Sequence, residues 1–190
     1  MTLSYAGITV ELREVLLRDK PNSMLKASAK GTVPVLVLPD NRVIDESAEV
    51  MMWALDQQDP EQWWRNDLAN ETNALVEEND FVFKKHLDHY KYADRHPEQP
   101  AIFYRTAAEK FLQKLEQKLA RKRFLLDADL SFADVAIFPF IRQFAFVDKA
   151  WFDQAPYPRL QIWLQSFLDS DLFLDVMKKF PTWREHPINE

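Results

Sequence analysis

Residues 31–47 read GTVPVLVLPDNRVIDES, and this stretch decides how the first third of the chain folds. The four apolar residues of 35–38 predict a strand that is buried on both faces. Asp40-Asn41 predicts a turn into a second short strand at 42–44, so the two runs form a hairpin. A helix is predicted to begin at Ser47, because apolar residues then recur at helical spacing.

The same stretch carries groups that suit an extended peptide. Val33 precedes a proline, which favours an extended backbone and leaves its N–H and C=O able to pair with a second chain. Glu46 and Ser47 stand where the helix begins, so the hydroxyl and first amides suit a carboxylate, while Glu46 suits an ammonium. The alternative is an ordinary Val33-Pro34 loop with Ser47 as an ordinary helix N-cap.

The residues before this stretch mix helix and strand signals. Met1–Tyr5, followed by Ala6-Gly7, is typical of the end of a helix. Alternating apolar and charged residues predict a strand over Thr9–Leu17. Lys20-Pro21 opens a short helix that ends before Gly31. We therefore expect a mixed α+β domain over residues 1–58.

The rest of the chain has helical patterns. The composition changes at Asp59-Pro60, so we expect a linker over 59–67 and an all-helical domain over 68–190. Ser131-Phe132-Ala133-Asp134 predicts a helix start in which Asp134 reaches back to the Ser131 amide. Apolar residues at three-and-four spacing mark further helices: Leu75, Val76, Phe83, Leu87 and Tyr90; Ala108, Phe111, Leu112, Leu115 and Leu119; Leu160, Trp163, Leu164, Phe167 and Leu168.

Composition excludes several classes of protein. Of the 190 residues, 47% are hydrophobic and 28% are charged, which is typical of a globular chain. A net charge of −6 disfavours a nucleic-acid partner, and the basic runs at 84–85 and 121–123 are interpreted as solvated helix faces. The chain has no cysteine, hence no thiol nucleophile. No apolar window reaches membrane-span length and no signal peptide is evident, so we expect a cytoplasmic protein without a membrane partner.

Two motifs in the same order resemble the cytosolic glutathione S-transferase family, and its omega-like and bacterial members most. The first comprises Lys20-Pro21, Gly31-Thr32-Val33-Pro34-Val35-Leu36 and Glu46-Ser47. The second is Ser131-Phe132-Ala133-Asp134-Val135-Ala136, which is similar to the family's helical-domain signature. The resemblance implies a thioredoxin-like N-terminal domain, an all-α C-terminal domain and a homodimer.

The resemblance also implies roles for individual residues. A cis Val33-Pro34 bond would present Val33, whose backbone would pair with the cysteinyl part of glutathione. Lys20 would meet the glycyl carboxylate, and Glu46 with Ser47 would hold the γ-glutamyl end. Glutathione would thus be the substrate, and no metal is expected.

The chain departs from the family pattern at its beginning. Family members start with a strand and a loop that carries the Tyr, Ser or Cys acting on the glutathione sulfur, whereas this chain starts inside the following helix. The catalytic residue is therefore unknown. The absent strand would be a central one, so unpaired strand edges are expected. Either Met1 is an internal methionine of a longer protein, which we favour, or the sheet is completed otherwise, for example by strand exchange in a dimer.

Three histidines at 86, 89 and 96 suggest two further interpretations. A metal site formed by His86 and His89 lacks a firm third ligand, and a solvated helix flank is favoured over it. By family analogy this helix would border the pocket of the electrophilic co-substrate, so Phe83, His86 and Tyr90 are candidates to line that pocket.

Two functions remain open from the sequence. The first is an enzyme that binds glutathione and transfers it to an unknown small electrophile or reduces a mixed disulfide. The second is a non-catalytic module that keeps the glutathione S-transferase fold for protein–protein interaction.

Overall fold

The computed structural model describes residues 1–185. The chain divides into two compact units: Met1–Pro60 together with residues 174–185, and Glu61–Phe173. By their contacts residues 174–185 group with the first unit, and the helical domain expected over 68–190 stays a prediction. The boundaries predicted from the sequence at residues 58 and 67 stay a prediction.

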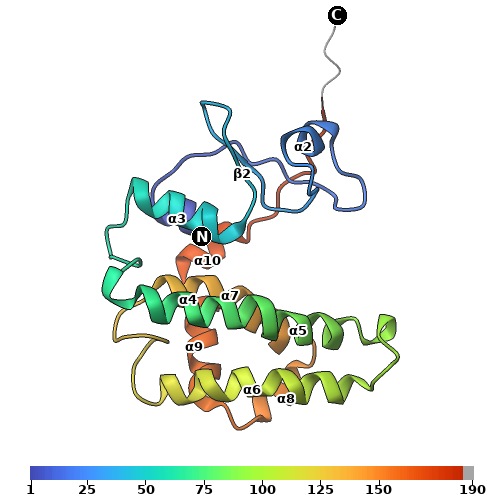
Figure 1. Cartoon of the computed structure of the whole chain (residues 1–190), viewed down its shortest axis with the longest axis vertical. Coiled ribbons are helices and arrows are strands. Elements are labelled where there is room, and N and C mark those ends of the chain that lie inside the picture. Colours follow the sequence, from blue (N-terminus) through green and yellow to red (C-terminus); the bar gives the residue numbers. More distant parts are fainter. Residues whose placement is uncertain (186–190) are drawn as a thin grey trace, which may run out of the picture. The chain divides into compact units, whose positions relative to one another are not determined.

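The first unit contains a small hairpin among short helices (Figure 1). Strands β1 (Leu36–Val37) and β2 (Val43–Ile44) are antiparallel, with Leu36 opposite Ile44. In the predicted turn Asn41 has a φ of 65°, and the Asp40 carboxylate accepts a bond from the Arg42 backbone N–H. The helices of this unit are α1 (Thr2–Tyr5), α2 (Asn22–Ala27) and α3 (Ser47–Gln57); α10 (Asp171–Val176) spans the boundary between the units.

The strand predicted over Thr9–Leu17 is wrong. The segment has no strand and only an isolated bridge between Leu16 and Asp19, and the side chains of Leu12 and Leu17 are 54% and 60% exposed. The Glu14 carbonyl accepts a bond from the Trp183 backbone N–H at 2.7 Å. A strand needs a neighbour for its ladder of hydrogen bonds, and within residues 1–185 the sheet has only β1 and β2. An alternating pattern does not supply that neighbour.

The prediction that the first strand is buried on both faces is also partly wrong. Leu38 is buried, but Val37 in β1 is 53% exposed, so the strand is not covered on both faces. The reason is the same: a two-stranded hairpin has two open edges and too few neighbours to enclose every side chain.

The second unit is helical, as the spacing of its apolar residues predicts. One predicted helix is divided into α4 (Ala69–Glu78), a π-helical turn η2 (Asn79–Phe83) and α5 (Lys84–Lys91). Helix α6 lies beside α5 (Figure 1). The other bounds are η1 (Asn66–Leu68), η3 (Ala93–Arg95), α6 (Ala101–Leu119), α7 (Phe132–Ala145), α8 (Lys149–Gln154) and α9 (Pro158–Leu168).

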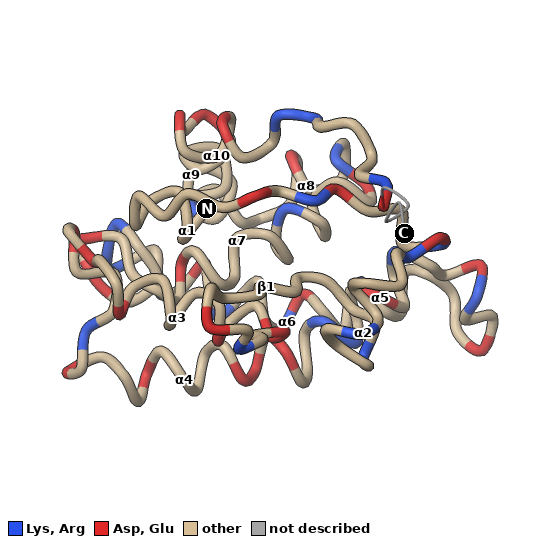
Figure 2. Tube along the Cα trace, turned by 90° about the horizontal axis from the view of Figure 1, so that it is seen from above, with Lys and Arg blue, Asp and Glu red and all other residues tan. Residues whose placement is uncertain are grey.

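Aromatic side chains fill much of the core of this unit. Phe83 packs against Phe111 and Phe144, with ring centroids 5.0 and 5.7 Å away. Phe138 stacks on Phe167 at 4.5 Å. Acidic and basic residues follow one another closely along the chain (Figure 2), so charge is spread over both units.

The predicted start of α7 is confirmed. Asp134 is fully buried and accepts bonds from the Ser131 backbone N–H at 3.1 Å and the Ser131 hydroxyl at 2.5 Å. It also accepts bonds from the Leu125 backbone N–H at 2.8 Å and the Trp163 indole N–H at 2.9 Å. One carboxylate thus joins the start of α7 to the preceding loop and to α9.

Candidate functional site

The Val33-Pro34 turn lies in the first unit and is exposed. The Val33-Pro34 bond is cis, as the resemblance implied, and Val33 is 50% exposed. Gly31 is buried with a φ of 61°, a left-handed conformation that favours glycine. No hydrogen bond of the Val33 backbone occurs within residues 1–185. Its N–H and C=O are therefore available to a second extended chain.

Lys20 lies next to this segment. Its Nζ is 3.7 Å from the position that a Cβ atom on Gly31 would occupy, so its stem runs along that glycine. Among the described residues no carboxylate lies within ion-pair distance of Lys20. The ammonium is thus close to the Val33-Pro34 turn and open to an anion.

The start of α3 offers a second anion-binding feature. Glu46 is the N-cap residue, and Ser47 is the first helical residue. Within residues 1–185 no side chain caps the helix, and the first intrahelical bond runs from the Val50 N–H to the Glu46 carbonyl. The alternative in which Ser47 is an ordinary N-cap therefore does not apply. The amides of residues 47–49 and the exposed Ser47 hydroxyl are left for another acceptor.

A small charged cluster surrounds Glu46. The Lys30 ammonium donates to Glu46 at 2.6 Å and to Asp45 at 2.9 Å, and Asp45 also accepts from the Ser28 hydroxyl at 2.6 Å. The Ser28 hydroxyl and then Lys30 lower the pKa of Asp45, while the two carboxylates raise the pKa of Lys30. Two carboxylates and one ammonium leave a single net negative charge, which suits a ligand ammonium.

The sequence interpretation missed Lys30, Asp45 and Ser28. Lys30 meets its two carboxylates across 15 and 16 residues of chain. Only the hairpin brings them together, and no local spacing announces such a pair. Asp45 and Glu46, two adjacent acids before the helix start, were the one feature of the sequence that could have suggested a nearby cation.

The residues predicted to line a second-substrate pocket belong to the helical unit. Phe83 is 1% exposed and Tyr90 is 7% exposed, and Tyr90 packs on Phe144 at 5.3 Å. Burial raises the pKa of Tyr90. His86 is half-buried, and burial together with nearby cations lowers its pKa. Two of the three side chains thus fill the core, and the lining role of the set stays a prediction.

The histidines weighed as metal ligands have another arrangement. The His89 ring stacks on the His96 ring at 3.9 Å, with Tyr104 edge-on to His89 at 4.9 Å. Within residues 1–185 no group of three or more His, Cys, Asp or Glu side chains is placed to hold a metal ion.

Comparison with models of known protein families identifies the family of this chain. Residues 1–63 match the N-terminal domain of glutathione S-transferases, and residues 64–166 match the C-terminal domain. The chain belongs to the glutathione S-transferase family. Its fold is accordingly a thioredoxin-like domain followed by a helical domain, as the motifs predicted. No curated protein matches the chain.

Solved glutathione S-transferases share this fold. A ternary complex of BphK, a bacterial GST, is 21% identical with a TM-score of 0.77, over 93% of this chain and 90% of that one. URE2P6 from Phanerochaete chrysosporium, in complex with oxidized glutathione, is 20% identical with a TM-score of 0.78, over 92% and 86%. A Burkholderia graminis glutathione transferase with two glutathione molecules per subunit is 18% identical with a TM-score of 0.77, over 92% and 79%. At these identities the similarity establishes the fold.

No helix within residues 1–185 combines the length and the apolar character that crossing a bilayer requires.

Proposed function

We propose that this glutathione S-transferase binds reduced glutathione in the first unit. The carrying observation is that the Val33 backbone, the Lys20 ammonium and the start of α3 are all without partners among the described residues. Family membership and the glutathione in two of the solved relatives support this choice of peptide.

Each end of the tripeptide has a matching group. The Val33 N–H and C=O pair with the cysteinyl main chain, and Lys20 pairs with the glycyl carboxylate. The γ-glutamyl carboxylate accepts bonds from the Ser47 hydroxyl and the first amides of α3, where the helix dipole favours negative charge. The γ-glutamyl ammonium meets the net negative cluster of Lys30, Asp45 and Glu46.

The reaction proposed is transfer of glutathione to a small electrophile or reduction of a mixed disulfide. In either case the bound sulfur attacks as a thiolate, and the protein positions it against the second substrate. Phe83, His86 and Tyr90 remain the proposed residues on the second-substrate side. The group that activates the sulfur is not assigned. No finding favours the alternative of a non-catalytic interaction module.

Calorimetric titration with reduced glutathione tests this function. We expect saturable binding with a Kd of about 1 mM or tighter. The matched control is the isomer with an α-linked glutamate, which has the same composition but moves the amino-acid head. Weaker binding of the isomer is expected, because its carboxylate and ammonium no longer both reach the start of α3. Equal binding of the two peptides would contradict the proposed orientation.

We further propose that the protein is cytoplasmic and forms a homodimer, without a metal, membrane or nucleic-acid partner. Phe81 and Val82, side by side on η2, are 79% and 52% exposed, and they supply an apolar contact for a second copy. Phe81→Asp is expected to shift the monomer–dimer equilibrium toward the monomer, because the dimer would bury the charge of the new aspartate. Analytical ultracentrifugation measures the shift. An unchanged dimer fraction would exclude this contact.

A further inference from the structure

The helical unit contains a cavity of about 330 Å³ that the glutathione site does not use. Four cations line it: Lys114 and Lys118 of α6, and Arg121 and Lys122 of the loop that follows. Glu71 of α4 is the lining carboxylate. The sequence had suggested that the basic run at 121–123 was merely a solvated helix face.

Local structure positions three of these cations. Lys114 and Lys118 are four residues apart in α6, so they lie on the same helix face. The loop then turns back, and the Lys122 ammonium donates to the Leu126 carbonyl at 2.5 Å. Leu125 and Leu126 are each 1% exposed, and the Leu125 N–H is held by Asp134. The loop side of the cavity is therefore anchored to the core.

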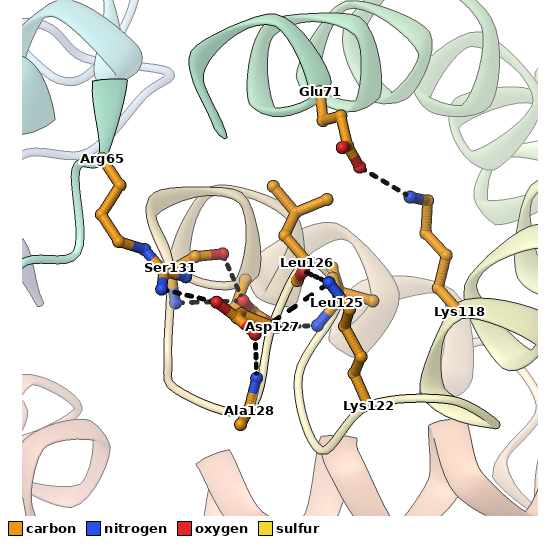
Figure 3. A network of polar contacts seen from close by, with 10 residues as sticks. Arg65, Glu71, Lys118, Lys122, Leu125, Leu126, Asp127, Ala128 and Ser131 are labelled. Atoms are coloured by element: carbon orange, nitrogen blue, oxygen red, sulfur yellow. Dashed lines mark hydrogen bonds and ion pairs between the residues drawn. The ribbon is translucent and has the colours of Figure 1, made fainter. Parts of the chain in front are cut away.

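The positive charge is only partly balanced. Glu71 of α4 and Lys118 of α6 point toward each other (Figure 3), and their charged atoms are 3.9 Å apart. Lys114 pairs with Glu78, and Lys122 lies 4.0 Å from Asp127, which is bound more closely by Arg65 at 2.8 Å. Among residues 1–185 the Arg121 guanidinium has no ion-pair or hydrogen-bond partner. Four cations and one carboxylate thus line a cavity in a chain of net charge −6.

The ordinary role of cations at a helix end explains only part of this cluster. Cations in the last turn stabilise the negative end of the helix dipole, and the effect is confined to that turn. Lys118 lies in the last turn of α6, but Lys114 lies more than one turn before the end at Leu119. The open cavity between the cations is also unnecessary for that role.

We propose that this cavity binds a small polyanion that carries two or more phosphate groups. At a rise of about 1.5 Å per residue, Lys114 and Lys118 start about 6 Å apart along the helix, so the cations suit separate anionic groups of one ligand. Each exposed ion pair contributes little alone, so several are needed for useful affinity. The volume lies at the small end of ligand pockets, which fits a short phosphate chain.

Calorimetry with inorganic tripolyphosphate, in the absence of glutathione, tests this site. We expect a Kd below about 1 mM that rises with salt, because the contacts are ionic. The double variant Lys118→Gln, Arg121→Gln is expected to bind roughly tenfold more weakly. The matched control, Lys84→Gln with Lys85→Gln, removes the same charge from the other basic run and should bind as the native protein does. Urea unfolding midpoints establish that both variants are folded.

Two further ligands complete the test. Orthophosphate is expected to bind at least about tenfold more weakly than tripolyphosphate, because it engages fewer cations. Metal-free ATP carries a triphosphate chain linked to a nucleoside. If the protein binds ATP as tightly as tripolyphosphate or more tightly, the site accepts both free and nucleoside-linked phosphate chains. Undetectable tripolyphosphate binding at about 1 mM, equal affinity for orthophosphate, or unchanged affinity in the Lys118 and Arg121 variant would overturn the proposal.

Discussion

Replacing Asp134 with alanine is expected to destabilise the helical unit by roughly 3–5 kcal/mol. The carboxylate accepts four hydrogen bonds in a fully buried position. Truncation leaves the Leu125 N–H and the Trp163 indole N–H buried without an acceptor, and it also frees the start of α7. Urea unfolding followed by far-UV circular dichroism measures the loss.

A closer variant separates hydrogen bonding from side-chain volume. Asp134→Asn keeps the shape but turns an NH₂ group toward the Ser131 N–H and hydroxyl, so we expect a loss of roughly 2–3 kcal/mol. The control Asp129→Asn changes an exposed carboxylate in the same loop and should stay within about 0.5 kcal/mol of the native protein. Native stability in Asp134→Asn would refute the role of the carboxylate as a double acceptor.

The same residue predicts a pH dependence. Burial raises the pKa of Asp134 despite its four donors. A raised pKa in the folded state means that the folded protein holds this proton more tightly than the unfolded chain does. The contribution of this proton to the free energy of unfolding is therefore fully present below the pKa of the unfolded chain, about 4. It is lost as pH rises through the pKa of the folded protein. In Asp134→Asn, which cannot release this proton, the decrease in unfolding free energy that Asp134 causes as pH rises should disappear.

Local signals were enough to predict several elements. The Asp40-Asn41 turn, the start of α3 at Ser47 and the capping box at Ser131 each depend on residues within a few positions of one another. Their hydrogen bonds join residues that are close in the sequence, so the local residue types are nearly enough to predict them.

Features that depend on distant partners were not predictable in this way. Thr9–Leu17 has the alternation of a strand but no neighbouring strand to pair with in the described residues. The pairing of Lys30 with Glu46 and the cavity between α4 and the end of α6 arise only when the chain folds back. The π-helical turn at Asn79–Phe83 was also missed, because Phe83, Leu87 and Tyr90 keep the three-and-four spacing of an ordinary helix after it.

Replacing Ser47 with alanine is expected to weaken glutathione binding by roughly 1–3 kcal/mol, because a carboxylate of the ligand loses a hydroxyl donor. In the described part of the chain this hydroxyl caps no backbone group, so the stability of the unliganded variant should change little. Calorimetry gives the affinity and urea unfolding gives the stability. The control Ser4→Ala removes an exposed hydroxyl from α1 and should leave the affinity unchanged.

The outcomes separate a binding group from a structural one. Weaker binding with native stability is the expected combination for Ser47→Ala. Native affinity in Ser47→Ala would show that the hydroxyl does not contact the ligand, and a large loss of stability would instead show a structural role.

The amide NMR spectrum of the ¹⁵N-labelled protein during a titration with reduced glutathione tests the binding mode most directly, because each amide reports its own hydrogen bonding. We expect the largest shifts at Val33, where the peptide main chain pairs, and at residues 47–49, where its amino-acid head is held. No shifts at about 10 mM glutathione, or shifts confined to the helical unit, would contradict a peptide bound along residue 33.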